Sequence, residues 1–173
     1  AASLRPLHSE VPTAWPVPSL DTSIPIDWNA RLVSAQLLLA ETTGDRALRE
    51  KASTLARRLL THVRDGRVPH RVRDDVACGG SLADETYLAL AAFDAGLGEQ
   101  ARVIVDRALS ARRLADGSFA DIHLDQPGPG LLRRPIAPLR ENAVFAELCA
   151  RFGGGYLETG HEILAATSGA ASR

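Results

Sequence analysis

The sequence predicts an all-α fold in which three α-hairpins stand side by side. Six segments place apolar residues at helical spacing, and these segments alternate in character. The first, third and fifth are apolar nearly all round, as expected of inner helices, whereas the second and fourth carry one apolar stripe and a charged outer face. The inner segments start near Asn29, Glu85 and Asn142, so successive starts lie 56 and 57 residues apart. A period of that size is typical of an array of helical hairpins.

Composition supports one compact domain and excludes several functions. The chain has 173 residues, 45% of them apolar, and a formal charge of −1. That charge lacks the basic footprint of a nucleic-acid binder, and we expect no nucleic-acid partner. No apolar run approaches the roughly 18–20 residues that cross a bilayer, so we expect no membrane insertion. The two cysteines, Cys78 and Cys149, form neither a redox motif nor a zinc motif.

The chain divides into a proline-rich arm, residues 1–26, and a helical body, residues 27–173. Five prolines in the arm remove backbone donors and favour an extended chain. In the first hairpin, Asp27 is expected to cap a helix over residues 28–42 that ends at Gly44. Asp45 is expected to cap the second helix, whose apolar stripe runs from Leu48 to Val63, with Gly66 as its end.

The remaining four helices follow from similar signals. Ser81 and Asp84 have the capping-box form ahead of an apolar run that stops at Gly96. A helix over residues 100–114 is expected next, with Arg112 and Arg113 away from its apolar side. The fifth and sixth helices are expected at residues 139–152 and 156–166, separated by three consecutive glycines.

The connections between helices differ in length. Inner-to-outer links are short, whereas the outer-to-inner links, residues 66–80 and 115–138, are long. In antiparallel hairpins this places every long loop at one end, over the N-termini of the inner helices. Loops displayed on a rigid scaffold are where function concentrates. Inner and outer helices with one loop-rich end describe an arc of an (α/α)6 toroid, of which three hairpins make about half.

Several motifs resemble a known family. The stretch Ile26-Asp27-Trp28-Asn29-Ala30, with Ser34-Ala35 one turn later, resembles a signature of the family typified by spermatogenesis-associated protein 20. That family joins a thioredoxin-like domain to an α/α toroid similar to N-acylglucosamine 2-epimerase. Further similar segments occur in the same order: Asp65-Gly66-Arg67-Val68-Pro69-His70-Arg71, Ser81-Leu82-Ala83-Asp84-Glu85, Phe119-Ala120-Asp121, Arg133-Arg134-Pro135 and Arg140-Glu141-Asn142-Ala143.

The resemblance implies a toroid of 2-epimerase-like ancestry that binds or isomerises a sugar at its long-loop face. The sequence departs from the family, because it has neither a thioredoxin-like domain nor a Cys-x-x-Cys motif. Three hairpins are also about half of a six-hairpin toroid. Either the chain is a fragment, or a partner chain or a second copy completes the ring.

Two histidines and one glutamate are the catalytic candidates. His70 and His123 each follow an Asp-Gly turn and precede an inner helix, so both should rim the long-loop face. Histidine titrates near neutrality, which suits proton transfer at a sugar carbon beside a carbonyl. Glu85, at the start of the third helix, is the third candidate. The alternative is that both histidines only anchor their loops.

The substrate-binding candidates stand at the starts of the inner helices. Asp84 either binds sugar hydroxyls or only completes the capping box, and the second interpretation is favoured. Trp28 offers a stacking surface and Asn29 hydrogen bonds, although a tryptophan at a hairpin junction more often packs. Arg140 either binds an anion or pairs with a loop acid. Asn142 stands beside it on the same helix.

No metal or cofactor is expected from the sequence. A metal site built from His70, His123, Asp84 and Glu85 would lack a local ligand spacing such as HxxxH, and no glycine-rich loop resembles a phosphate cradle. Two hypotheses remain open. The protein is either a sugar-binding or sugar-isomerising toroid segment, or a non-catalytic interaction subunit of a larger assembly whose arm contacts a partner.

Overall fold

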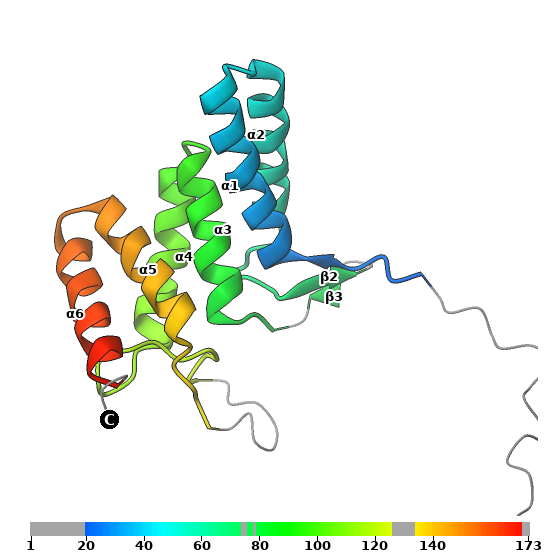
Figure 1. The fold of residues 1–173 in the computed structure, drawn as a ribbon. Helices are drawn as coiled ribbons and strands as arrows, with labels where there is room; N and C mark the ends of the chain where they lie inside the picture. The colour runs from blue at the N-terminus through cyan, green and yellow to red at the C-terminus, as the bar shows by residue number, and fades with distance from the viewer. Residues whose placement is uncertain (1–19, 74–75, 78, 126–133, 171–173) are drawn as a thin grey trace, which may run out of the picture.

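The computed structural model describes residues 20–73, 76–77, 79–125 and 134–170. The predicted all-α class is confirmed, with six helices and one small sheet among the described residues (Figure 1). The helices are α1 (Ile26–Thr43), α2 (Arg46–Leu60), α3 (Leu82–Asp94), α4 (Gly98–Ala111), α5 (Leu139–Phe152) and α6 (Gly155–Ala170). The strands are β1 (Ile24–Pro25), β2 (Arg71–Arg73) and β3 (Val76–Ala77).

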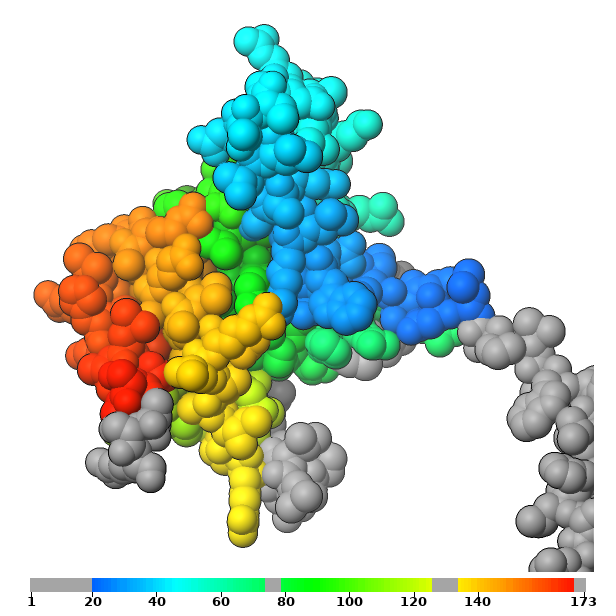
Figure 2. Space-filling view, in the orientation of Figure 1, coloured from blue at the N-terminus to red at the C-terminus, as the bar shows by residue number. Residues whose placement is uncertain are grey.

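The helices pair as three antiparallel hairpins, α1 with α2, α3 with α4 and α5 with α6. Helix α3 lies at the centre and packs against α1 on one side and α5 on the other. The α1–α2 pair forms one lobe and the α5–α6 pair forms another, with the α3–α4 pair between them (Figure 2). The hairpin array is therefore present in the structure. Closure of such an array into a ring would need hairpins beyond these three.

The cap signals are confirmed at two of the three predicted N-termini. The Asp45 side chain accepts a hydrogen bond from the Leu48 amide, and Ser81 and Asp84 form the complete capping box. The third prediction was wrong, because Pro25 is the N-cap of α1 and no side chain caps that helix. Asp27 lies inside the first turn and is buried. A side chain can cap only from an extended residue that precedes the helix, and here strand β1 supplies that residue.

Two predicted helix ends also shift. Helix α2 ends at Leu60 rather than at Gly66, and α4 ends at Ala111 rather than at residue 114. The residues after α4 turn inward, so Arg112 is fully buried instead of lying on the outer face. Helix α5 has the predicted bounds, and α6 extends to Ala170.

The inner helices are not buried equally. Helix α3 is buried on nearly every side, as predicted, because it has neighbours on both flanks. Helix α1 does not fit the prediction, since Trp28 is 72% exposed and Leu38 is 66% exposed. Within the described part of the chain, α1 packs against α2 and α3 on one flank only. Part of its apolar surface, which includes Trp28 and Leu38, is therefore exposed.

A three-stranded antiparallel sheet, in the order β1-β2-β3, was not predicted. Its strands are two or three residues long, too short to show an alternating pattern in the sequence. Ile24 pairs with Val72 and Pro25 with Arg71, so the last residues of the predicted arm join the sheet. Residues 1–19 of that arm lie outside the described residues.

The hydrophobic core follows α3 and joins the hairpins. Leu82, Leu88 and Ala92 of α3 are fully buried, and they belong to one cluster with residues of all six helices. Phe119 of the α4–α5 connection packs against Phe145 of α5, with ring centroids 5.1 Å apart. None of the described helices is both long enough and apolar enough to span a bilayer.

Candidate functional site

Three chain segments meet at the N-terminal ends of α1 and α3. The Ile26 amide donates a hydrogen bond of 3.0 Å to the His70 carbonyl, and the next residue pair, Pro25 and Arg71, is joined in the sheet. The first turn of α1 is thereby fixed beside His70. This contact makes His70 part of a rigid corner rather than of a free loop.

A glycine allows the third segment to approach. A Cβ atom at Gly80 would lie 1.8 Å from the Val68 carbonyl oxygen, a distance that no side chain tolerates. Only glycine therefore lets the residues that lead into α3 lie against the Val68–His70 stretch. This close approach brings the first turn of α3 to the side chain of His70.

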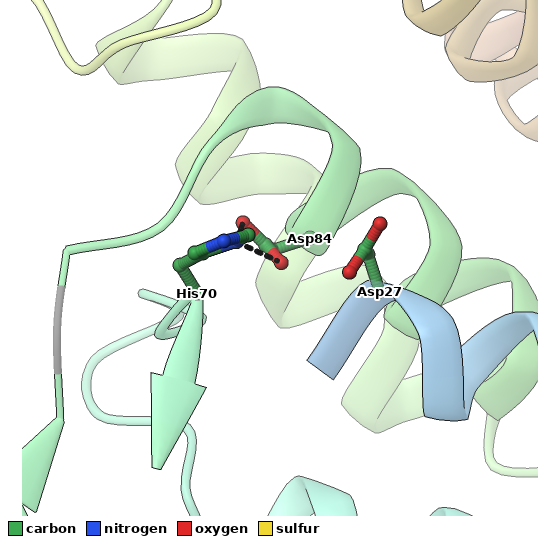
Figure 3. Close-up of side chains that lie close together, drawn as sticks. All are labelled: Asp27, His70 and Asp84. Carbon is green, nitrogen blue, oxygen red and sulfur yellow. Dashed lines mark hydrogen bonds and ion pairs between the residues drawn. The ribbon is translucent and has the colours of Figure 1, made fainter. Parts of the chain in front are cut away.

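The Asp84 carboxylate contacts the His70 imidazole. The Nδ1 atom of His70 lies 3.2 Å from each carboxylate oxygen of Asp84, and dashed lines mark these two contacts in Figure 3. Asp84 is fully buried and also accepts hydrogen bonds from the Ser81 amide and hydroxyl. Burial raises the pKa of the Asp84 carboxyl, and the Ser81 and His70 contacts oppose that rise. The His70 side chain is 45% exposed, so this pair is a carboxylate–histidine dyad with one side open to solvent.

Asp27 is the third member of this corner. One ligand atom from each of Asp27, His70 and Asp84 can be chosen so that all three lie within 4.8 Å of one another (Figure 3). The Asp27 side chain is 10% exposed, and its Oδ2 atom lies 3.6 Å from the Arg31 guanidinium. Its Oδ1 atom is buried and has no hydrogen-bond partner among the residues that the structure describes. A buried acceptor without a partner carries a desolvation cost.

An aromatic ring with two arginines extends the site along the inner helices. The Arg31 guanidinium lies 3.7 Å from the centroid of the Tyr87 ring, and that of Arg140 lies 5.9 Å from it. Asp27 and Arg31 are one turn apart on α1, as Asp84 and Tyr87 are on α3. The face therefore combines carboxylates, a histidine and two cations.

Glu85 and His123, both predicted to be catalytic, belong to a separate buried network. Glu85 accepts hydrogen bonds of 2.6 Å from Arg112 Nε at one oxygen and lies 2.6 Å from His123 Nε2 at the other. Glu85 is fully buried and His123 is 8% exposed. Arg112 also donates to the carbonyls of Gly80 and Asp121. Through Arg112 the network joins Gly80, in the connection before α3, to Asp121, in the connection before α5.

Two of the predicted substrate-binding residues use their side chains within the fold. The side-chain oxygen of Asn142 accepts a hydrogen bond from the Phe119 amide, and its nitrogen donates to the carbonyls of Phe119 and Pro138. The Asn29 amide donates to the Pro25 carbonyl. Trp28, by contrast, exposes its ring, and Arg140 is exposed beside Tyr87. The structure thus leaves Trp28 and Arg140 available to a ligand.

The sequence analysis does not identify Arg31 or Tyr87 as site residues, and it predicts other roles for Asp27 and Arg112. Arg112 had a usable signal, because Ala101, Val105 and Ala108 continue to it at helical spacing and all are buried. The sequence predicts Asp27 as a cap because an acidic residue beside a predicted helix start is a common cap. Its position relative to His70 depends on strand pairing, which the sequence pattern did not reveal.

An open cavity lies near the other end of the inner helices. This open cavity of about 470 Å³ is bordered by Ser34 of α1, Asp94 of α3 and Arg151 of α5, among others. Asp94 accepts hydrogen bonds from both Ser34 and Arg151, so its carboxylate is satisfied by the protein. Of the predicted site residues, none lines this cavity.

The fold and this corner define a class: a helical-hairpin array with a carboxylate–histidine dyad at the N-terminal end of its inner helices. Comparison with known proteins places the chain in no family, because no family model and no curated protein matches it.

Proposed function

We propose that the face formed by the N-terminal ends of α1, α3 and α5 binds a sugar, and that His70 transfers a proton at the sugar carbon beside the carbonyl. The observation that carries this proposal is the Asp84–His70 dyad, in which a buried carboxylate orients a histidine that is 45% exposed. The resemblance to the 2-epimerase-like toroids supplies the substrate class. The proposal includes membership of a larger α/α toroid.

The chemistry needs one base close to a carbonyl. His70 removes the proton from C2 of an open-chain N-acylated hexosamine, the electron pair of the C–H bond forms the C1–C2 double bond, and the carbonyl π pair moves onto the carbonyl oxygen to give an enolate. The same imidazolium then returns a proton to C2. Asp84 fixes the ring and stabilises its charged form.

Sugar contacts would come from the exposed residues around the dyad. The Trp28 ring, 72% exposed, offers an apolar face for stacking. The Arg140 guanidinium, beside Tyr87 and Arg31, can donate to the enolate oxygen or to a substituent with negative charge.

Epimerisation requires a proton on the opposite face of the carbon as well. His123, the second base predicted from the sequence, is 8% exposed and held against Glu85 at 2.6 Å. In this conformation it does not reach a substrate. We therefore propose that the chain by itself exchanges the C2 proton faster than it inverts the centre.

The test measures deuterium uptake at C2 of N-acylated hexosamines in D₂O by NMR, with a chelator present. Wild-type chain is expected to incorporate deuterium, and His70→Gln to lose that activity while still binding sugar in saturation-transfer experiments. His62 is a partly buried histidine just after α2, and His62→Gln is the matched control, which should behave as wild type. Absence of uptake by wild type, or unchanged uptake in His70→Gln, would overturn the proposal.

A second candidate function, a docking subunit, is favoured by the free face of α1. Trp28, Leu32 and Leu39 are 72%, 48% and 53% exposed, and together with exposed Ala35 they form one stripe at helical spacing. A further hairpin, from a second copy or a partner chain, would cover this stripe as α1 covers α3. Light scattering tests it: a dimer that dissociates on Leu32→Glu supports docking between copies, whereas a monomer at high concentration argues against that form.

A further inference from the structure

We propose that Asp27, His70 and Asp84 form a binding site for one divalent transition-metal ion, with Zn²⁺ as the best-fitting ion. The three side chains come from α1, from the residue before β2, and from α3, so the site exists only in the folded chain. The inference does not rest on sugar binding, because the ion can be tested without any sugar.

The ligand set has the composition of an open metal site. Two carboxylates and one imidazole supply three protein ligands, and catalytic zinc sites use three protein ligands with the remaining position left for water. The set carries two negative charges when His70 is neutral, which matches the charge of the ion. The His70 side chain is 45% exposed, so this ligand residue borders solvent.

The spacing is close to what an ion requires. Ligand atoms about 2.1 Å from a zinc ion lie roughly 3–4 Å apart. His70 Nδ1 lies 3.2 Å from the Asp84 oxygens, and the three chosen ligand atoms span at most 4.8 Å. A movement of about 1 Å by one carboxylate would bring the set within coordination distance.

The independent observation is the unpartnered oxygen of Asp27. Its side chain is nine-tenths buried, and Oδ1 has no hydrogen-bond partner within the described part of the chain. The Arg31 guanidinium approaches the other oxygen, Oδ2, at 3.6 Å. A metal ion held at this corner would remove the cost of burying that oxygen.

The imidazole ligand selects the kind of ion. Mg²⁺ and Ca²⁺ prefer sites made only of oxygen, whereas imidazole favours zinc and its neighbours in the first transition row. With the ion bound, His70 acts as a ligand and is no longer a base. Metal binding and the proposed proton transfer therefore exclude each other at this residue.

The experiment uses the full chain, stripped with chelator and titrated with Zn²⁺ alone in a calorimeter. Wild type is expected to bind one ion, and its melting temperature is expected to rise by about 5–10 °C at a free-ion concentration of 100 times Kd. Mg²⁺ should produce no comparable shift. Asp27→Asn and His70→Gln should each weaken zinc binding at least tenfold.

Asp94→Asn is the matched control, because Asp94 also lies on α3 and its carboxylate is paired within the protein. Its zinc affinity should equal that of wild type. Wild type that binds no zinc at millimolar concentration, or Asp27→Asn that binds as tightly as wild type, would overturn the proposal. If Asp27→Asn does not fold, His70→Gln decides in the same way, because its partly exposed side chain is dispensable for the core.

The two proposals fail separately. Trp28→Ala should impair sugar binding and leave zinc binding intact, whereas Asp27→Asn should do the reverse. If Asp27→Asn lost both sugar binding and zinc binding, the variant would have lost the structure of this corner. The melting temperature of metal-free Asp27→Asn is the control, because an unchanged value excludes such a loss of structure.

Discussion

Removal of the Arg112 guanidinium should destabilise the protein more than any other single change of a charged side chain described above. Arg112 and Glu85 are both fully buried and joined by a 2.6 Å hydrogen bond, and the guanidinium also satisfies the carbonyls of Gly80 and Asp121. In Arg112→Met the stem keeps its packing, but Glu85 remains as a buried charge without its main partner. The partly buried carbonyls of Gly80 and Asp121 each lose a donor as well, although the Asp121 carbonyl keeps the Leu82 amide.

The magnitude follows from those losses. Breaking one side of a buried ion pair costs about 3–5 kcal/mol, a large part of the 5–15 kcal/mol that stabilises a typical domain. For a chain of this length each kcal/mol lowers the melting temperature by about 2–4 °C. We expect Arg112→Met to melt about 6–20 °C below wild type, as measured by circular dichroism.

The neighbouring arginine provides the control. Arg113 is paired with Glu162 on the surface, with side-chain exposures of 45% and 56%. Such a pair contributes about 1 kcal/mol or less, so Arg113→Met should melt within about 4 °C of wild type. Adding Glu85→Gln to Arg112→Met removes the stranded charge and should recover part of the loss. Equal melting temperatures for Arg112→Met and Arg113→Met would refute this account of the network.

Two further predictions concern ionisation. Asp125 accepts hydrogen bonds from Arg107 and Arg67, and these contacts lower the pKa of its carboxyl below 3.8. The stabilisation is therefore present above pH 3.8 and is lost as the pH falls through the lowered pKa. Wild type and Asp125→Asn should differ in melting temperature by a few degrees at neutral pH, and their melting temperatures should converge in acid. A difference that stays constant with pH would contradict this prediction. Burial raises the pKa of the Cys149 thiol to about 12. In a Cys78→Ser chain the remaining thiol should therefore not react with a disulfide reagent at neutral pH, and it should react fully only after denaturation. Rapid labelling of the native chain would show instead that the thiol is accessible.

The directions in which two neighbouring carboxylates face explain why the predicted site divides into two. Asp84 and Glu85 are both fully buried, but Asp84 contacts the part-exposed His70, whereas Glu85, the very next residue on α3, binds Arg112 and His123. Successive helical residues differ by about 100° around the axis, so neighbours in the sequence serve different networks. Sequence order groups Asp84 with Glu85, but packing separates them.

The sequence by itself determined the local structure. Asp45, the Ser81–Asp84 capping box and Gly44 act within one turn of their own helices, so their signals are readable without knowledge of distant residues. The alternation of inner and outer helices likewise follows from apolar periodicity. The prediction that α1 is buried on every side was wrong, because burial also depends on how many neighbours a helix has.

Only the tertiary structure decided the site. Asp27, His70 and Asp84 belong to segments far apart in the chain, and they meet because β1 pairs with β2 and because Gly80 permits close backbone contact. Strand pairing over two residues and a single backbone contact leave no periodic signal. The helices could therefore be predicted from local energetics, whereas the position of Asp27 beside His70 depended on long-range packing.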